Sequence, residues 1–298
     1  MLISTSVCHQ GLVRERNEDS VVGNESLGLW VVADGVGGNA HGDVASQLVV
    51  QTIERRIRQG MTLHEAVTDA NEAIISAIEN QSELDGMAST VVACLFHGHQ
   101  FELAWVGDSR AYLIDNEGIS LLSSDHNLAN ELFQQGMIRE DEVQTHSGQH
   151  ELTQAMGQMN LSRIPKVLGE LHEGDVLLLC TDGLSGPLLE QLIYQTVSEA
   201  QSLDDAGESL LDKVLEAGAP DNVSFSLIQF EEDIRQIRAS DFNSKPKTKG
   251  TGFKSKPPKL ESTFRRPFDK RPYMRHLKGR SMMLALVLFA IVFLILFI

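Results

Sequence analysis

Residues 28–38 read Gly-Leu-Trp-Val-Val-Ala-Asp-Gly-Val-Gly-Gly, an apolar run followed at once by an aspartate and a glycine-rich turn. The run predicts a buried strand over 28–33 that ends at Asp34. A glycine beside an aspartate lets the backbone approach a ligand closely and frees a carbonyl to bind it. This stretch therefore predicts a strand that carries a carboxylate to one edge of a sheet.

Similar patterns recur along the chain. Other apolar runs predict strands over 90–96, 101–106, 111–114, 119–122, 175–181 and 223–230. Apolar residues at helical spacing predict helices over 44–58, 63–78 and 203–217. Two early helices followed by a meander of strands favour antiparallel sheets covered by helices over a parallel doubly wound sheet.

Composition sets further bounds. The chain has 298 residues, 42% of them hydrophobic and 22% charged, which excludes disorder throughout. Its net charge is −16, although thirteen of its 25 Lys and Arg residues follow Asp241. The preceding part is therefore strongly acidic, which disfavours nucleic-acid binding. The three cysteines, Cys8, Cys94 and Cys180, lie far apart and are expected to be free thiols buried in the core.

The composition changes after the acidic part, and three regions result. Residues 1–231 are expected to form a globular domain, and residues 232–280 a basic linker rich in proline and lysine. Residues 281–298 are expected to form a transmembrane helix, because 282–298 are uncharged and apolar and about 17 to 25 residues span a bilayer. The alternative, a buried core helix, does not suit a segment that is apolar all round. The basic residues before it predict a single-pass tail anchor with the domain in the cytoplasm.

Five aspartates from distant segments stand beside predicted strands. They are Asp19, Asp34, Asp108, Asp182 and Asp221. An aspartate before a glycine is by itself typical of a turn, but loops at strand ends can bring several together. Oxygen ligands of this kind suit hard cations such as magnesium and manganese. The set therefore predicts a divalent-metal site.

Six motifs that contain these residues occur in a fixed order. They are Arg-Glu-Arg-Asn-Glu-Asp (14–19), Asp-Gly-Val-Gly-Gly (34–38), Gly-Asp-Ser-Arg (107–110), Ser-Asp-His (124–126), Cys-Thr-Asp-Gly-Leu (180–184) and Pro-Asp-Asn-Val (220–223). In these motifs the sequence resembles the metal-dependent protein serine/threonine phosphatases of the 2C type (PPM family), in their bacterial form. The resemblance covers residues 1 to about 231. It implies an α+β fold, a four-layer αββα sandwich of two antiparallel sheets flanked by helices.

The resemblance also implies a metal cluster of two to three divalent ions, Mn²⁺ or Mg²⁺. In the family, the aspartate matching Asp34 bridges two ions, and the glycine matching Gly35 donates its carbonyl to one of them. The residues matching Asp182 and Asp221 hold the second ion. The aspartate matching Asp108 joins Asp182 at a weaker third site.

The remaining matched residues act around these ions. The acid matching Asp19 lies in or next to their ligand shell, and the arginine matching Arg14 holds the substrate phosphate. A guanidinium makes a two-pronged contact with phosphate that lysine cannot reproduce. Two bridged metal ions would deliver hydroxide in line to phosphorus, without a covalent phosphoenzyme.

One position departs from the eukaryotic pattern. Eukaryotic relatives carry a histidine directly after the Asp-Gly pair, thought to protonate the leaving group, whereas this chain has Val36. The candidate general acids here are His150, His126 and His41, with His146 close by. Each of these histidines also suits a surface or hydrogen-bonding role, and metal-bound water could serve instead.

The expected function is hydrolysis of phosphoserine and phosphothreonine in proteins, at the cytoplasmic face of a membrane. The expected partners are phosphoproteins made by a serine/threonine kinase, with no nucleic acid. A non-catalytic phosphoprotein sensor or scaffold is the alternative, and hydrolysis of a small phosphorylated metabolite is a third reading. The segment 127–157 takes the place of the family's mobile flap and is expected to govern substrate access.

Overall fold

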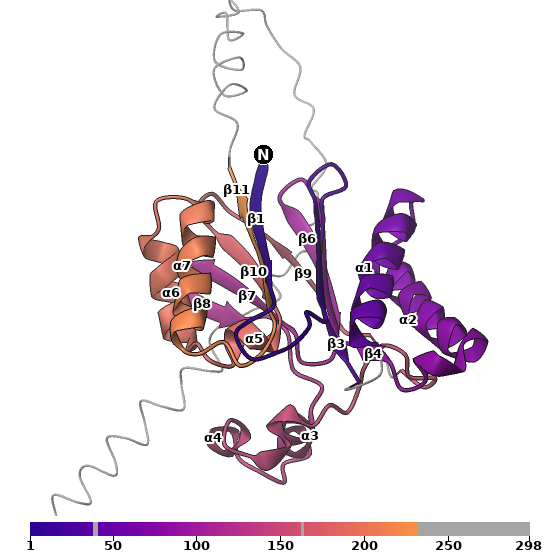
Figure 1. Ribbon diagram of the computed structural model, residues 1–298. Coiled ribbons are helices and arrows are strands. Elements are labelled where there is room, and N and C mark those ends of the chain that lie inside the picture. Colours follow the sequence, from indigo (N-terminus) through magenta and orange to yellow (C-terminus); the bar gives the residue numbers. More distant parts are fainter. Residues whose placement is uncertain (38–40, 162–163, 232–298) are drawn as a thin grey trace, which may run out of the picture. The chain divides into compact units, whose positions relative to one another are not determined.

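The computed structural model describes residues 1–37, 41–161 and 164–231 (Figure 1). The predicted linker, 232–280, and the predicted transmembrane helix, 281–298, lie outside the described residues. Of the helices in the described part, none is long and apolar enough to cross a membrane.

One antiparallel sheet has the strand order β1-β11-β10-β7-β8. Its strands are β1 (Leu2–His9), β7 (Arg110–Asp115), β8 (Gly118–Leu121), β10 (Val176–Cys180) and β11 (Val223–Phe230). Strand β1 pairs with β11 from Leu2↔Phe230 to His9↔Val223, so the first strand completes an edge of the sheet beside the last. The two ends of the described chain therefore lie side by side (Figure 1).

The second sheet has the order β2-β3-β5-β6-β9, and the short β4 pairs with β3. Its strands are β2 (Asp19–Asn24), β3 (Leu29–Val36), β4 (Ala88–Ser89), β5 (Val91–His97), β6 (Gln100–Val106) and β9 (Lys166–Glu170). Strands β5 and β6 form a hairpin whose turn contains Gly98 at φ 69°, a conformation that glycine adopts without strain.

Helices cover the outer face of each sheet (Figure 1). The helices are α1 (Gly42–Arg58), α2 (Leu63–Asn80), η1 (Ser82–Leu84), α3 (Leu128–Gln134), α4 (Glu140–Val143), η2 (Ser147–His150), α5 (Asp182–Ser185), α6 (Glu190–Glu199) and α7 (Leu203–Glu216). Helices α1 and α2 pack on the second sheet, and α6 and α7 on the first. Helices α3 and α4 lie apart from both helical layers (Figure 1).

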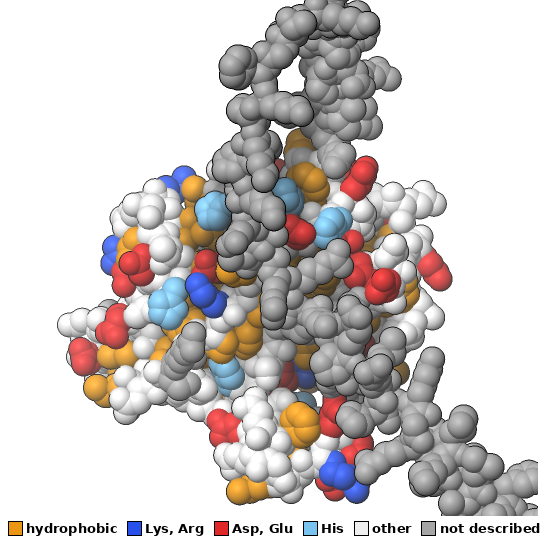
Figure 2. Space-filling model, turned by 180° about the vertical axis from the view of Figure 1, so that it is seen from behind, with side chains coloured by type: hydrophobic (Ala, Val, Ile, Leu, Met, Phe, Trp, Pro, Cys, Tyr) orange, Lys and Arg blue, Asp and Glu red, His pale blue; other side chains and the backbone are white. Residues whose placement is uncertain are grey.

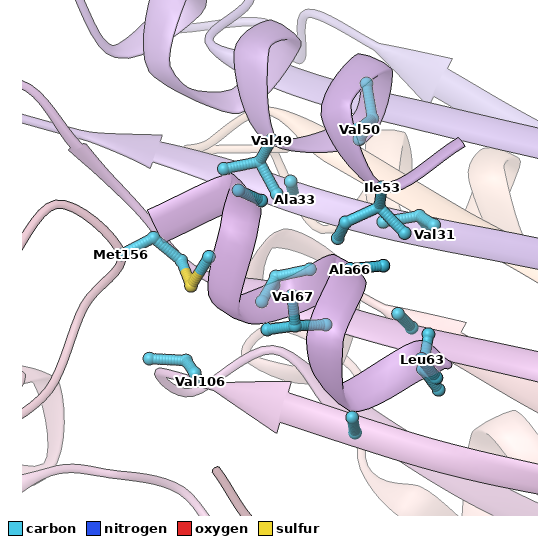
Figure 3. Packing of buried hydrophobic residues seen from close by; sticks show 14 of the residues in the cluster. Val31, Ala33, Val49, Val50, Ile53, Leu63, Ala66, Val67, Val106 and Met156 are labelled. Atoms are coloured by element: carbon cyan, nitrogen blue, oxygen red, sulfur yellow. The ribbon is translucent and has the colours of Figure 1, made fainter. Parts of the chain in front are cut away.

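Alternation along β3 explains the layering. Val31 and Ala33 face α1 and α2, where they meet Ile53 in one buried cluster (Figure 3). Trp30 and Val32 point the other way, into a separate cluster between the two sheets. A strand presents successive side chains to opposite faces, so a strand that is apolar throughout is buried on both. A further cluster packs the first sheet against α5, α6 and α7.

The predicted elements are found within two residues, and the antiparallel sandwich is confirmed. The predicted end of the first strand at Asp34 was wrong: β3 continues to Val36, because Gly35 and Val36 pair with β4. Strands β1, β2, β4 and β9 and helices α3 to α6 were not predicted. All of them are short or lie at an edge and lack a long apolar run.

The cysteine prediction holds for two residues of three. Cys94 and Cys180 are buried, and all three thiols are free. Cys8 is exposed, contrary to expectation, because it lies on the edge strand β1. Its Sγ accepts a hydrogen bond from Asn17 Nδ2 at 3.2 Å.

We expect Ile53→Ala to lower the free energy of unfolding by about 2–5 kcal/mol, because Ile53 is fully buried between α1 and the second sheet. Leu168→Ala is the matched control. Leu168 is 49% exposed on β9, and its truncation should cost less than about 1 kcal/mol. Urea denaturation measures both. Equal losses of unfolding free energy in the two variants would show that packing of α1 on the sheet stabilises the fold no more than an exposed surface residue does.

Candidate metal centre

The segments that carry the predicted site residues meet where the two sheets end together. Asp19 is the first residue of β2 and pairs with Asp34 of β3. Asp182 follows β10 directly, and Asp221 precedes β11. Cys180 pairs with Phe225, so the end of β10 lies beside the start of β11. The fold therefore places these four carboxylates at one end of the sandwich.

Asp19 is the most deeply buried of them, at 7% exposure. Its Oδ2 accepts a hydrogen bond from Thr181 Oγ1 at 3.1 Å. Its Oδ1 is buried and has no hydrogen-bond partner in the described part of the chain. Burial, with the neighbouring charges of Asp182 and Asp221, raises the pKa of Asp19 to about 7. An unpartnered oxygen on a carboxyl group under such repulsion is suited to receive a cation.

Asp34 is half-buried and is fixed through its backbone. Its N–H donates to Thr90 Oγ1 at 3.0 Å, and its carbonyl accepts from Thr90 N at 2.8 Å and from Ser89 Oγ at 3.0 Å. The side chain stays free of these contacts. Burial, followed by the charges of Asp19 and Asp182, raises the pKa of Asp34 well above its ordinary value.

Gly35 lies where only glycine fits. A Cβ at this position would overlap the carbonyl of Gly42 and come within 2.7 Å of Glu18 O. The Gly35 N–H donates to that same Glu18 carbonyl at 3.0 Å. The absence of a side chain thus lets β3 lie directly against the start of α1 and the Glu18 backbone.

Asp182 and Asp221 are half-buried neighbours. Burial and the charge of Asp221 raise the pKa of Asp182, whose Oδ1 is buried without a hydrogen-bond partner among the described residues. Asp221 Oδ2 accepts from Arg14 Nη2 at 2.7 Å. The Arg14 side chain is 52% exposed. The structure therefore brings Arg14, the residue predicted to bind the substrate phosphate, to the edge of the carboxylate cluster.

Asp108 lies on the loop between β6 and β7. Burial and the charge of Asp182 raise its pKa to about 7, which places it within electrostatic reach of the other carboxylates. The next residue, Ser109, is buried, and its Oγ lies 2.6 Å from Thr90 Oγ1. Thr90 also binds the Asp34 backbone, so one threonine ties the loop of Asp108 to the strand of Asp34.

Asn222 organises the site and was not predicted to do so. Its Nδ2 donates to Gln10 O at 2.8 Å and to Arg16 O at 2.9 Å, and its Oδ1 accepts from Glu18 N at 2.8 Å. One amide thus holds the whole loop that carries Arg14. Asn222 lies within the Pro-Asp-Asn-Val motif, but a motif does not say which backbone groups a side chain will bind.

The donor set fits hard divalent ions. It consists of carboxylate oxygens, which are ligands that Mg²⁺ and Mn²⁺ prefer. The unpartnered buried oxygens of Asp19 and Asp182 lie in this set. Within the described residues, no three His, Cys, Asp or Glu side chains converge closely enough to hold one ion in the recorded conformation.

The candidate general acids lie in different surroundings. His41 is exposed and precedes α1 in a left-handed conformation, φ 59°. His150 ends η2 and is exposed, and its charge acts to lower the pKa of Asp182. His146 Nδ1 accepts from Gly148 N at 3.0 Å, which caps η2. His150 thus acts electrostatically on a site carboxylate.

His126 is held in one protonation state. Its ring Nδ1 accepts from Gly107 N at 3.1 Å, and its backbone N–H donates to Gly107 O at 2.9 Å. An acceptor nitrogen carries no proton, so the ring is neutral in this arrangement. Burial also lowers the pKa of His126, which favours the neutral ring. These contacts assign His126 to fixing the loop before Asp108 and argue against its role as proton donor.

Comparison with known proteins agrees with this geometry. The profile of the family described as Protein phosphatase 2C matches residues 5–229. The serine/threonine phosphatase stp of Listeria monocytogenes is 28% identical over 240 residues, covering 76% of this chain and 94% of that protein. The serine/threonine protein phosphatase PstP of Mycobacterium tuberculosis is 34% identical over 224 residues, which are 72% of this chain and 42% of that protein.

Solved structures show the same fold. The crystal structure of the Mycobacterium tuberculosis phosphatase PstP superposes with a TM-score of 0.71 at 31% identity, covering 78% of this chain and 99% of that one. The catalytic domain of PstP in complex with two manganese ions gives a TM-score of 0.68 at 30% identity, over 76% of this chain and 97% of that one.

The two sheets, the covering helices and the family match define the class: the chain belongs to the protein phosphatase 2C family. Within it, the chain is an enzyme of the bacterial serine/threonine phosphatase group, to which the similar proteins above belong.

His126 should make the stability of the protein fall in acid. A histidine whose folded-state pKa is lowered contributes stability above its ordinary pKa of 6.5 and loses it as pH falls through and below that value. We expect His126→Asn, which keeps an acceptor for Gly107 N–H, to flatten the fall of the melting temperature between about pH 7 and pH 5. His146→Asn, at the cap of the short helix η2, is the control. An unchanged acid slope in His126→Asn would contradict the assigned neutral ring.

Proposed function

We propose that this chain hydrolyses phosphoserine and phosphothreonine in proteins, with two to three divalent ions, Mn²⁺ or Mg²⁺, as cofactors. The observation that carries the proposal is the half-buried carboxylate cluster whose members raise one another's pKa, with Arg14 at its edge. Divalent cations offset that repulsion, and a phosphate dianion requires the same positive charge.

The residues divide by role. Asp34, Gly35 through its carbonyl, Asp182 and Asp221 would hold the paired ions. Asp19, which is 7% exposed, would support the cluster through its unpartnered oxygen. When bound, divalent ions lower the pKa of water and supply positive charge to the phosphate.

Asp108 and Asp182 together suit a further, weaker site. Burial and the charge of Asp182 raise the pKa of Asp108, so the two carboxylates repel each other and a cation between them would relieve the repulsion. The expectation of a third ion rests on this pair.

Arg14 is the residue that we assign to the substrate phosphate. Its side chain is half exposed, and its recorded ion pair is a single contact with Asp221. A guanidinium in this position can leave a carboxylate for a phosphate at small cost, because exposed ion pairs are weak. The loop behind it is rigid, since Asn222 and Gln10 bind its backbone.

We also propose that the enzyme is tail-anchored, with its domain in the cytoplasm and its substrates among phosphoproteins made by a serine/threonine kinase. The apolar run 282–298 and the basic residues before it support the anchor. Acidic side chains recur over the face shown in Figure 2, where Lys and Arg are sparse. A surface of this charge disfavours nucleic acid as a partner.

Asp34→Asn should abolish most phosphatase activity and leave the fold intact, because it removes the charge of the central carboxylate but keeps its shape. The measurement is release of phosphate from a phosphothreonine peptide by full-length protein with Mn²⁺, together with the melting temperature. Asp43→Asn, in the first turn of α1, is the control. Wild-type protein that binds the phosphopeptide without cleaving it would favour the sensor or scaffold reading. Near-normal turnover by Asp34→Asn would refute the metal assignment.

Full-length protein should sediment with membranes and resist carbonate extraction, because 282–298 is long enough to span a bilayer. Deletion of 282–298 should move the protein to the supernatant, while deletion of only part of the linker should not. Recovery of the full-length chain in the supernatant would refute the proposed anchor without affecting the proposed activity.

A further inference from the structure

A partly buried ion pair beside the candidate metal centre takes no part in the proposed chemistry. Arg110 opens β7 two residues after Asp108, and Asp125 lies between β8 and α3. Arg110 Nε and Nη2 donate to the two carboxylate oxygens of Asp125 at 3.0 and 2.7 Å. Asp125 is 7% exposed. This planar, two-pronged pairing is one that arginine makes and lysine cannot.

Further contacts fix both partners. The third guanidinium nitrogen, Nη1, donates to the hydroxyl of Tyr112 at 3.1 Å, so each nitrogen of Arg110 has a partner. Asn127 Nδ2 approaches the Asp125 carboxylate at 3.4 Å, while Asn127 Oδ1 caps α3 by accepting from Asn130 N. The guanidinium is therefore held in one orientation.

The charge of this arginine reaches the candidate metal ligands. Burial and Asp182 raise the pKa of Asp108, and Arg110 partly offsets that rise. Burial and Asp221 raise the pKa of Asp182, and Arg110 again acts in the opposite direction. Arg110 pairs with Cys180 across β7 and β10, two residues before Asp182, and lies two residues after Asp108, so its guanidinium is a potential partner for either carboxylate. If it turned toward them, it would compete with a divalent ion for the same oxygens.

Arg14 and Arg110 differ in how firmly their side chains are held. The Arg14 side chain is 52% exposed and has one carboxylate contact. It can therefore exchange Asp221 for a substrate phosphate. Arg110 is 30% exposed and has both carboxylate oxygens of Asp125 together with Tyr112. One arginine is free to move, and the other is restrained.

We propose that Asp125 is a positioning residue that holds the Arg110 guanidinium away from Asp108 and Asp182, so that these carboxylates remain available to a divalent cation. The inference rests on the proposed function, because it concerns metal binding at that site. Asp125, the aspartate of the Ser-Asp-His motif, would thus act without contacting metal or substrate.

The test is calorimetric titration of Mn²⁺ into full-length protein, purified in detergent and stripped of metal, with the melting temperature of each variant. Asp125→Asn keeps the shape and removes the charge that restrains Arg110. Arg110→Gln removes the competing charge itself, and the double variant removes both. Asp69→Asn is the matched control, since it breaks the Arg56–Asp69 ion pair, 2.7 Å long, between α1 and α2.

We expect Asp125→Asn to weaken Mn²⁺ binding by about tenfold or more, because an unrestrained charge on the strand beside Asp182 competes with the ion. Arg110→Gln should bind Mn²⁺ at least as tightly as wild type, and the double variant should recover the affinity that Asp125→Asn loses. The control should change stability alone.

A merely structural ion pair gives a different pattern, in which both single variants lower the melting temperature and weaken Mn²⁺ binding alike. That result, or wild-type affinity in folded Asp125→Asn, overturns the inference. If loss of the buried charge prevents Asp125→Asn from folding, Arg110→Gln decides: weaker Mn²⁺ binding by this variant overturns the inference, and equal or tighter binding supports it. Failure of wild-type protein to bind Mn²⁺ would instead refute the proposed function.

Discussion

Repulsion between carboxylates that are partly withdrawn from water is the constraint on which the rest of this structure depends. Asp19, Asp34, Asp108 and Asp182 each have a pKa raised first by burial and then by the charge of at least one neighbouring carboxylate, which for Asp182 is Asp221. Such a cluster is unfavourable in an isolated fold, and its energy falls when cations enter. The scaffold must therefore hold the backbone firmly while the acidic side chains stay free to bind.

The sandwich meets this requirement through backbone contacts. The two sheets end at the same place, and hydroxyl and amide side chains bind the loops between them: Thr90 binds Asp34, and Asn222 binds the loop that carries Arg14. Glycine allows the closest approaches, as at Gly35 against Gly42. Uncharged side chains and backbone groups thus fix the loops that carry the acidic residues.

The sequence predicted the elements that carry long apolar runs and the acids that follow them. It did not predict β1, where Ser4, Thr5 and Ser6 interrupt the apolar residues of an edge strand, nor the exposure of Cys8 on that strand. The neutral state of His126 was also beyond prediction, because it depends on a contact with Gly107 nineteen residues away. Local patterns reveal burial and chemistry, whereas tertiary hydrogen bonds decide protonation and orientation.

The most direct test of the central claim is an anomalous difference map from crystals of this protein grown with Mn²⁺. The account predicts manganese peaks in contact with Asp34 and Asp182, within the acidic cluster at the end of the two sheets. Crystals with ordered carboxylates and no manganese peak among them, or with peaks confined to other acidic surfaces, would contradict it.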